Sequence, residues 1–208
     1  MSRREMSEMK NKLLLVIGAI ALVNSPISAH KIVEPGEPRK VAKGTLMAVS
    51  GQQWNRLQQK EGKYQEVWSV DGHHLNRIAF YGAVPVDKPL IKERHKKRAP
   101  LPKVQANMLL PDIPVLLERT YRAQYSIPNF EIGLQEPAKF IGQKGIRFEY
   151  SYTNPDDEVK RSGEGFGALV DGALYLVTYE APSLYYFEKE KEEFRGVVER
   201  LELREQRR

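Results

Sequence analysis

The chain has 208 residues, no cysteine, 41% hydrophobic residues and a formal net charge of +6. This length allows one domain of ordinary size, and the hydrophobic fraction excludes a largely disordered chain. Residues 1–29 carry a net charge of +2, residues 92–103 carry +5, and all the others together carry −1. The body is thus close to neutral, which argues against a nucleic-acid-binding domain with cations spread over one face.

The first 29 residues have the three-part pattern of a secretory signal peptide. A positively charged segment, Arg3 to Lys12, precedes an apolar run from Leu13 to Val23. Small residues follow, so we predict cleavage between Ala29 and His30. The apolar run would form about 16 Å of helix, roughly half of a bilayer core, so an uncleaved anchor is the weaker alternative.

The absence of cysteine bears on how the protein could be anchored in the cell and on what stabilises its fold. A bacterial lipid anchor is attached to a cysteine, so we predict that the protein is not a lipoprotein. With no disulfides, the mature chain must be stabilised by its hydrophobic core. We therefore expect a periplasmic protein with no transmembrane span in its mature form.

Polar segments flank one predicted domain, which covers residues 45–203. Residues 30–44 contain two prolines and two glycines, and predict a linker or a lead-in along an edge. Leu46 to Val49 is predicted as a short strand, and Trp54 to Leu57 begins or flanks the body. Residues 204–208 form a charged tail.

A hairpin and a long connection come next. Two strand patterns, Tyr64 to Val70 and Leu75 to Tyr81, are joined by Asp71-Gly72, with His73 and His74 lengthening the turn. Residues 83–111 hold five prolines and a basic cluster, and predict a long irregular loop.

Residues 112–125 predict a helix. Asp112 is placed to cap it, and Pro114 falls in the first turn, where its missing N–H costs nothing. One face is mostly apolar and consists of Ile113, Leu116, Leu117, Thr120, Tyr121 and Gln124. Pro128 ends the pattern.

Four strands and a final helix complete the chain. The strands are predicted at Phe130 to Gln135, Gly145 to Thr153, Gly163 to Val170, and Ala173 to Glu180. Asp171-Gly172 joins the last two as a two-residue hairpin turn. The helix is predicted from Pro182 to about Leu203.

This order predicts an α+β protein with an antiparallel sheet of about six strands and helices packed against it. The runs YGAVP (81–85), RFEYSYT (147–153) and DGALYLVTYEAPSLYYF (171–187) resemble the PsbP-like fold family, over about residues 45–203. The similarity is greatest to small secreted envelope proteins of Gram-negative bacteria. It implies a mostly non-enzymatic role in assembly or binding, and it carries over no catalytic residues.

No residue pattern predicts a metal, a cofactor or a catalytic site. His73 and His74 are adjacent, so on a strand they would point to opposite faces, and we interpret them as polar turn residues. His30 and His95 lie in segments predicted to be flexible. The acidic run 156–158 is interpreted as a solvated turn, because the rest of a calcium loop is missing.

Two further patterns leave alternatives open. Gly163, Gly165 and Gly167 would face one side of an extended strand. Either a helix or aromatic side chains pack closely on them, or they form the floor of a ligand groove. The aromatic run 185–187 is interpreted as helix packing, with a rim that stacks on a sugar or partner as the alternative.

The basic cluster is the strongest polar anomaly. It consists of Lys92, Arg94, Lys96, Lys97 and Arg98. It is either a solvated loop or a contact with an anionic surface, namely lipid or an acidic envelope protein.

The sequence thus predicts a non-catalytic periplasmic binding or assembly module of the bacterial envelope. An envelope hydrolase with scattered catalytic residues and a binding domain for a small apolar molecule are the alternatives. A concave pocket with convergent titratable groups would favour the hydrolase.

Overall fold

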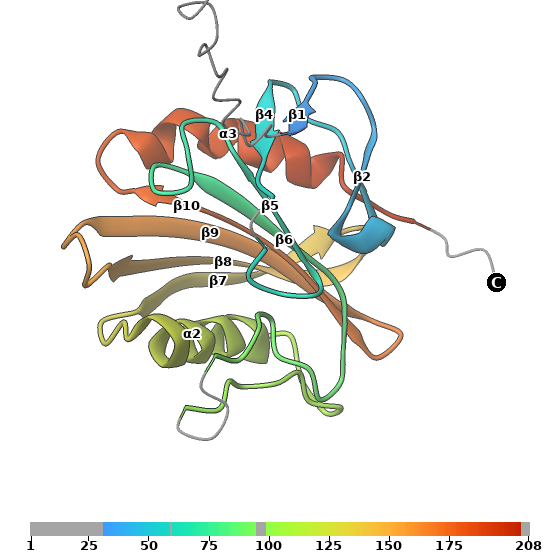
Figure 1. Cartoon of the computed structure of the whole chain (residues 1–208). Coiled ribbons are helices and arrows are strands. Elements are labelled where there is room, and N and C mark those ends of the chain that lie inside the picture. Colours follow the sequence, from blue (N-terminus) through green and yellow to red (C-terminus); the bar gives the residue numbers. More distant parts are fainter. Residues whose placement is uncertain (1–30, 59, 95–98, 205–208) are drawn as a thin grey trace, which may run out of the picture.

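One antiparallel sheet with a helix on each face organises the chain (Figure 1). The computed structural model describes residues 31–58, 60–94 and 99–204. The predicted signal peptide and its cleavage site, Ala29 and His30, lie outside the described residues. So do Lys96, Lys97 and Arg98 of the basic cluster.

The main sheet has eight strands, not the six or so expected. In spatial order they are β1 (Lys31–Val33), β4 (Trp54–Arg56), β5 (Gln65–Ser69), β6 (Arg77–Pro85), β10 (Ala173–Pro182), β9 (Lys160–Val170), β8 (Gln143–Thr153) and β7 (Glu131–Phe140). The two extra strands, β1 and β4, are only three residues long, so their patterns are too short to reveal strand alternation.

A second, small sheet joins both ends of the described chain. It has the order β11 (Glu202–Leu203), β3 (Leu46–Ala48) and β2 (Arg39–Val41), with a short 3-10 turn η1 (Ala42–Gly44) after β2. The segment expected to be a linker or an edge lead-in therefore contributes β1 and β2.

Helices α2 (Asp112–Tyr125) and α3 (Tyr186–Glu199) cover opposite faces of the main sheet (Figure 1). The bounds of α2 agree with the sequence pattern, but Pro111 occupies the cap position, and the Asp112 carboxylate accepts a hydrogen bond from the Leu109 N–H at 2.8 Å. Helix α3 is shorter than expected at both ends, because β10 continues through Pro182 before it and the chain forms β11 after it. No helix among the described residues is long and apolar enough to cross a bilayer.

Turn chemistry explains the hairpins. Asp171 and Gly172 have φ of 50° and 74°, as the two-residue turn requires. Ile141 and Gly142 form a similar turn, with φ of 46° and 77°, that the sequence reading missed. Strand β7 runs through Pro137, which is tolerated because β7 is an edge strand.

The alternation of side chains along the strands separates two hydrophobic cores. Ala79 and Tyr81 of β6 face α2, while Ile78 and Phe80 face α3. The irregular connection after β6 belongs to the α2 side, where it buries Leu90, Ile91, Leu101 and Val104. We call the two surfaces of the sheet the α2 face and the α3 face.

Candidate functional site

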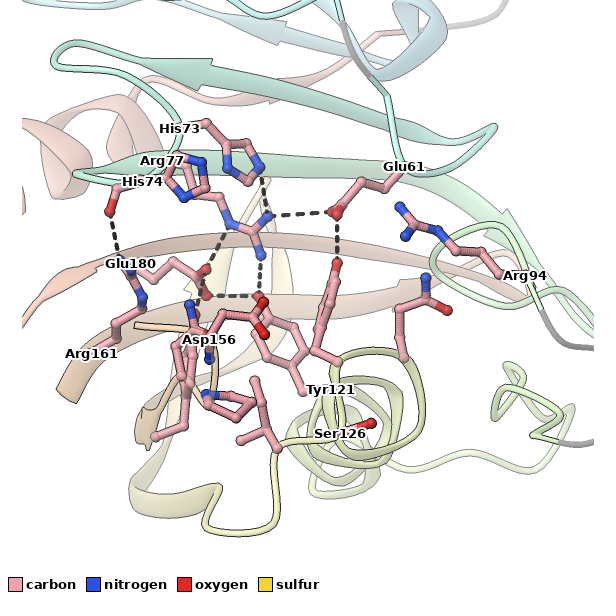
Figure 2. A pocket seen from close by; sticks show the side chains of 16 residues that line it. Glu61, His73, His74, Arg77, Arg94, Tyr121, Ser126, Asp156, Arg161 and Glu180 are labelled. Atoms are coloured by element: carbon pink, nitrogen blue, oxygen red, sulfur yellow. Dashed lines mark hydrogen bonds and ion pairs between the residues drawn. The ribbon is translucent and has the colours of Figure 1, made fainter. Parts of the chain in front are cut away.

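A polar cavity of about 570 Å³ opens on the α2 face, between the β5–β6 loop, the end of α2 and the β8–β9 turn (Figure 2). Its walls carry charged, hydroxyl and amide groups, with Ile127 and Pro155 as the aliphatic exceptions. This composition disfavours a small apolar ligand, because polar groups lose hydration when such a ligand covers them.

A buried ion pair forms the floor of the cavity. Arg77 of β6 and Glu180 of β10 are cross-strand partners, and Arg77 Nε lies 2.7 Å from a Glu180 carboxylate oxygen. Their side chains are only 7% and 6% exposed. A buried charge needs such a partner because its loss of hydration is otherwise uncompensated.

Three tyrosine hydroxyls complete the shell around Glu180. Tyr121 of α2 donates to it at 2.7 Å, and Tyr150 and Tyr152 of β8 donate at 3.0 and 2.8 Å. The Tyr121 hydroxyl also accepts a hydrogen bond from Arg77 at 2.7 Å. Burial raises the pKa of Glu180, but Arg77 and these hydroxyls outweigh it and hold the pKa below its ordinary value.

A glycine allows Tyr150 to reach across the sheet. In the strand register, Gly163 of β9 lies between Tyr150 of β8 and Glu180 of β10. A Cβ atom at Gly163 would overlap the Tyr150 ring. The missing side chain therefore makes room for the ring over β9, and it links the glycine pattern to the buried network.

Arg77 also holds a second carboxylate. Its terminal nitrogen lies 3.3 Å from Glu61, which precedes β5 and accepts a hydrogen bond from the Tyr125 hydroxyl at 2.7 Å. Burial opposes ionisation of Glu61, but Arg77 and Tyr125 together lower its pKa. Arg77 is thus fixed between two carboxylates that come from distant parts of the chain.

The tyrosines of the network are neutral hydrogen-bond donors. Burial is the main cause that raises the pKa of Tyr121, Tyr150 and Tyr152, and the charge of Glu180 raises it further. Their rings also pack against one another, with Tyr121 edge-on to Tyr152 at 5.4 Å between ring centres. Aromatic packing and hydrogen bonding therefore fix the hydroxyl positions together.

The two histidines form part of the cavity wall. His73 Nε2 lies 3.4 Å from an Arg77 nitrogen. Burial, and then the charge of Arg77, lowers the His73 pKa, so the neutral ring prevails at pH 7. Arg161 donates to the backbone oxygen of His74 at 2.6 Å, which ties the loop to β9.

The geometry favours binding over proton transfer. The Glu180 carboxylate already receives four donors, and the Arg77 guanidinium is shared between Glu180, Glu61 and Tyr121. A general base has to be free to accept a proton, and a lowered pKa weakens it further. The wall also has side chains that lack a hydrogen-bond or ion-pair partner within the described ranges: Arg94, Gln124, Ser126 and Asp156.

Within the described ranges, no group of three or more histidine, aspartate and glutamate side chains is arranged to hold a metal ion. His73 and His74 share the cavity wall, but His73 Nε2 lies 3.4 Å from the cation Arg77, which repels metal ions. Asp157 of the acidic turn pairs with Arg161 at 2.6 Å.

The remaining predicted residues lie in two places. Lys92 and Arg94 are exposed, and Arg94 stands at one end of the cavity, opposite Arg161 (Figure 2). Gly165 and Gly167 lie under Phe148 and Ile113, so core side chains occupy the space above them, and neither glycine lines this cavity.

The network residues Arg77, Glu180 and Glu61 were missed by sequence reasoning. A signal was present for Glu180, because it follows the apolar run 174–177 on a strand expected to be central. A charged residue in such a place is buried with a partner, or it ends the strand. The sequence does not show which cation is the partner of Glu180.

The fold has a counterpart among solved structures, although no family model and no curated protein matches the chain. The structure of PsbP from the cyanobacterium Synechocystis is similar, with a TM-score of 0.52 and 14% identity, over 90% of this chain and 99% of that one. This confirms the PsbP-like fold and leaves the function open.

Two other structures are more distant. The Ran-binding protein Mog1p of Saccharomyces cerevisiae has a TM-score of 0.46 and 10% identity, over 84% of this chain and 95% of that one. LpqN of Mycobacterium tuberculosis, involved in cell envelope biogenesis, has a TM-score of 0.32 and 8% identity, over 85% and 91%.

Proposed function

We propose that this protein is exported to the bacterial periplasm and acts there as a non-catalytic binding or assembly module. The polar cavity of the α2 face holds its partner or ligand. The proposal rests mainly on one observation: the cavity floor is a buried network in which the groups that could react are already bound to one another. Fixed dipoles and charges of this kind recognise a polar group without having to reorganise.

Support for export comes from the sequence of residues 1–29. We expect the mature protein to begin at His30, to lack a lipid anchor and to be released with the periplasmic fraction. Intact-mass analysis of that fraction tests this. Recovery of only the full-length species from the cytosol would contradict export.

Site-specific crosslinking in intact cells tests the role of the cavity. A photoreactive residue at Gln124 lies in the cavity wall, while one at Arg119 is exposed on the same helix and does not line this cavity. We expect an adduct from position 124 that is weak or absent from position 119. The adduct should diminish when Asp156, which lines the same cavity from the β8–β9 turn, is replaced by Ala.

Equal adducts at both positions would mean that the cavity does not select the partner. Absence of any adduct at Gln124, with the protein folded and in the periplasm, would contradict the proposed binding site.

A further inference from the structure

A basic surface lies beside the cavity. The sequence pattern singled out only Lys92 and Arg94 of it, because its residues come from three separate segments. Its cations are Lys43 of η1, Lys60 and Lys63 before β5, and Lys88, Lys92 and Arg94 after β6. All six are exposed, and none has an ion-pair partner among the residues that the structure describes. We call these six residues the basic surface.

Contacts show that the six cations belong together. Lys60, Lys63, Lys88 and Lys92 line one groove, and Lys60, Lys92 and Arg94 line the cavity next to it. The amino groups of Lys43 and Lys63 both lie over the ring of Tyr64, at 5.1 and 5.5 Å from its centre. Of the acids in these segments, Glu61 is bound to Arg77, Glu93 accepts the Leu101 N–H at 3.2 Å, and Asp87 is exposed.

The groove has apolar walls within this cationic rim. Its volume is about 470 Å³, and Tyr64, Pro89 and Ile91 line it together with the lysine stems. The two loops that form it are held together, because the Lys92 N–H donates to the Glu61 backbone oxygen at 2.6 Å. A Cβ atom at Gly62 would collide with the Leu90 backbone oxygen, so the loops pack at backbone distance.

We propose that the basic surface docks the protein on an anionic phospholipid bilayer. Five of its six cations are lysines, which attract phosphate as point charges without needing a fixed bidentate geometry. An apolar groove between lysines also suits the interface of a bilayer, where anionic headgroups lie next to hydrocarbon. An acidic protein would match the charge but leaves the apolar groove unexplained.

Docking would place the polar cavity beside the membrane surface. Lys60, Lys92 and Arg94 are shared with a cavity of about 390 Å³ that is also lined by His73, His74 and Gln124. These last three residues line the proposed binding cavity as well. The inference rests on the proposed function in one respect, the periplasmic location of the protein. Binding to vesicles can be measured whether or not that location is correct.

Vesicle co-sedimentation tests the proposal, with the proposed mature chain, which lacks residues 1–29. This chain keeps the fold's core, because the buried hydrophobic side chains of the described residues lie between Val33 and Leu201. We compare vesicles of phosphatidylcholine alone with vesicles that also contain phosphatidylglycerol, at low and at physiological salt. Binding should need the anionic lipid and weaken with salt, since screening shortens the range of attraction to about 10 Å at 0.1 M.

A matched pair of variants locates the surface. Each cation close to an anionic membrane contributes about 1 kcal/mol, or about fivefold in partitioning, so Lys60→Glu with Lys92→Glu should weaken binding by about 25-fold or more. The control is Lys139→Glu with Lys144→Glu, which changes the net charge equally. These two lysines lie in the β7–β8 hairpin, which β6, β10 and β9 separate from β5. The control should bind like the wild type, and both variants should unfold like it.

Three results would overturn the inference: no binding of wild type to anionic vesicles at low salt, equal binding to neutral vesicles, or equal loss in both variants. The Lys60→Glu, Lys92→Glu variant can also be tested in the crosslinking experiment. If it loses a protein adduct at position 124 but still binds anionic vesicles, the basic surface binds an acidic protein instead. A negative vesicle result with the Gln124 adduct intact refutes lipid docking alone and leaves the proposed function standing.

Discussion

The two faces of the sheet each bury a carboxylate, and they stabilise it in different ways. On the α3 face, Glu164 of β9 is fully buried between Arg147 of β8 and Arg195 of α3. These arginines are partly exposed and continue to Glu136, Glu149 and Glu192, whose side chains are 40–79% exposed. The α3-face network therefore leads outward to solvent.

On the α2 face, the shell of Glu180 is one buried arginine and three tyrosine hydroxyls. This network ends at the wall of a cavity. The comparison teaches that burying a charge does not by itself mark a site. A buried charge marks a site when its hydrogen-bonding shell is directed into a cavity rather than back to the surface.

The largest effect should come from removing the buried cation. Arg77→Met leaves two carboxylates without their common partner, and breaking a buried pair costs about 3–5 kcal/mol. Arg195→Met should cost about 1 kcal/mol, because the Arg195 side chain is 32% exposed and Arg147 still holds Glu164. Urea unfolding of both variants measures the difference. Equal losses would show that the faces do not differ in this way.

Acid should weaken the α2 face through its carboxylates. The pKa of Glu180 is lower in the folded state than in the unfolded chain, so its contribution to stability is complete above the unfolded value. That contribution is lost as the pH falls through the lower, folded-state pKa. Glu61 acts in the same direction.

Glu180→Gln is therefore expected to be less stable than wild type at pH 7, with the gap narrowing below about pH 4.5. Thermal unfolding at a series of pH values measures this. A gap that stays constant down to the acid limit would mean that Glu180 is not ionised in the folded protein at pH 7.

The sequence predicted the elements of the α2 face better than the network inside it. Tyr150 and Tyr152 lie two positions apart in the strand expected at 145–153, a spacing that puts both on one face. The helix pattern placed Tyr121 on the apolar side of α2. Their meeting at Glu180 depends on the register of three strands, which no local pattern encodes. The same holds for Arg77, which is separated from Glu180 by 103 positions.

The basic surface was hidden for a similar reason. The counting of charge along the chain singled out residues 92–98, whereas Lys43, Lys60 and Lys63 looked like ordinary exposed lysines. Folding brings them to the groove through the contact between the loop before β5 and the loop after β6. Sequence charge runs therefore underestimate a surface built from several loops.

A smaller pair of effects should separate the hydroxyl groups of the two faces. Tyr152→Phe removes a hydrogen bond to the charged Glu180, which is worth about 1.5–3 kcal/mol. Tyr179→Phe on the α3 face removes a bond to the backbone oxygen of Tyr186, with a cost of about 1 kcal/mol. Denaturant midpoints of the two variants, each compared with the wild type, rank the two losses of stability. A larger loss for Tyr179→Phe would contradict a hydrogen bond from Tyr152 to an ionised Glu180.

The smallest expected effect has the opposite sign, and it compares one glycine from each face. On the α2 face, Gly165→Ala would push a Cβ atom into the ring of Phe148, which the packed core cannot move, so a loss of about 1–3 kcal/mol is expected. On the α3 face, a Cβ atom at Gly196 would lie 3.1 Å from the guanidinium of Arg200.

That guanidinium ends a flexible side chain that is 42% exposed, and it bonds the Val49 backbone oxygen at 3.1 Å and pairs with Glu193 at 3.6 Å. A shift of a few tenths of an ångström relieves the contact and keeps both interactions. Glycine inside a helix costs about 0.5–1 kcal/mol relative to alanine, because it loses more backbone freedom on folding. Gly196→Ala should therefore raise the free energy of unfolding by up to that amount. A decrease in the urea midpoint would show that Arg200 is held in place, and that the α3 face is packed as rigidly at its rim as the α2 face is over β9.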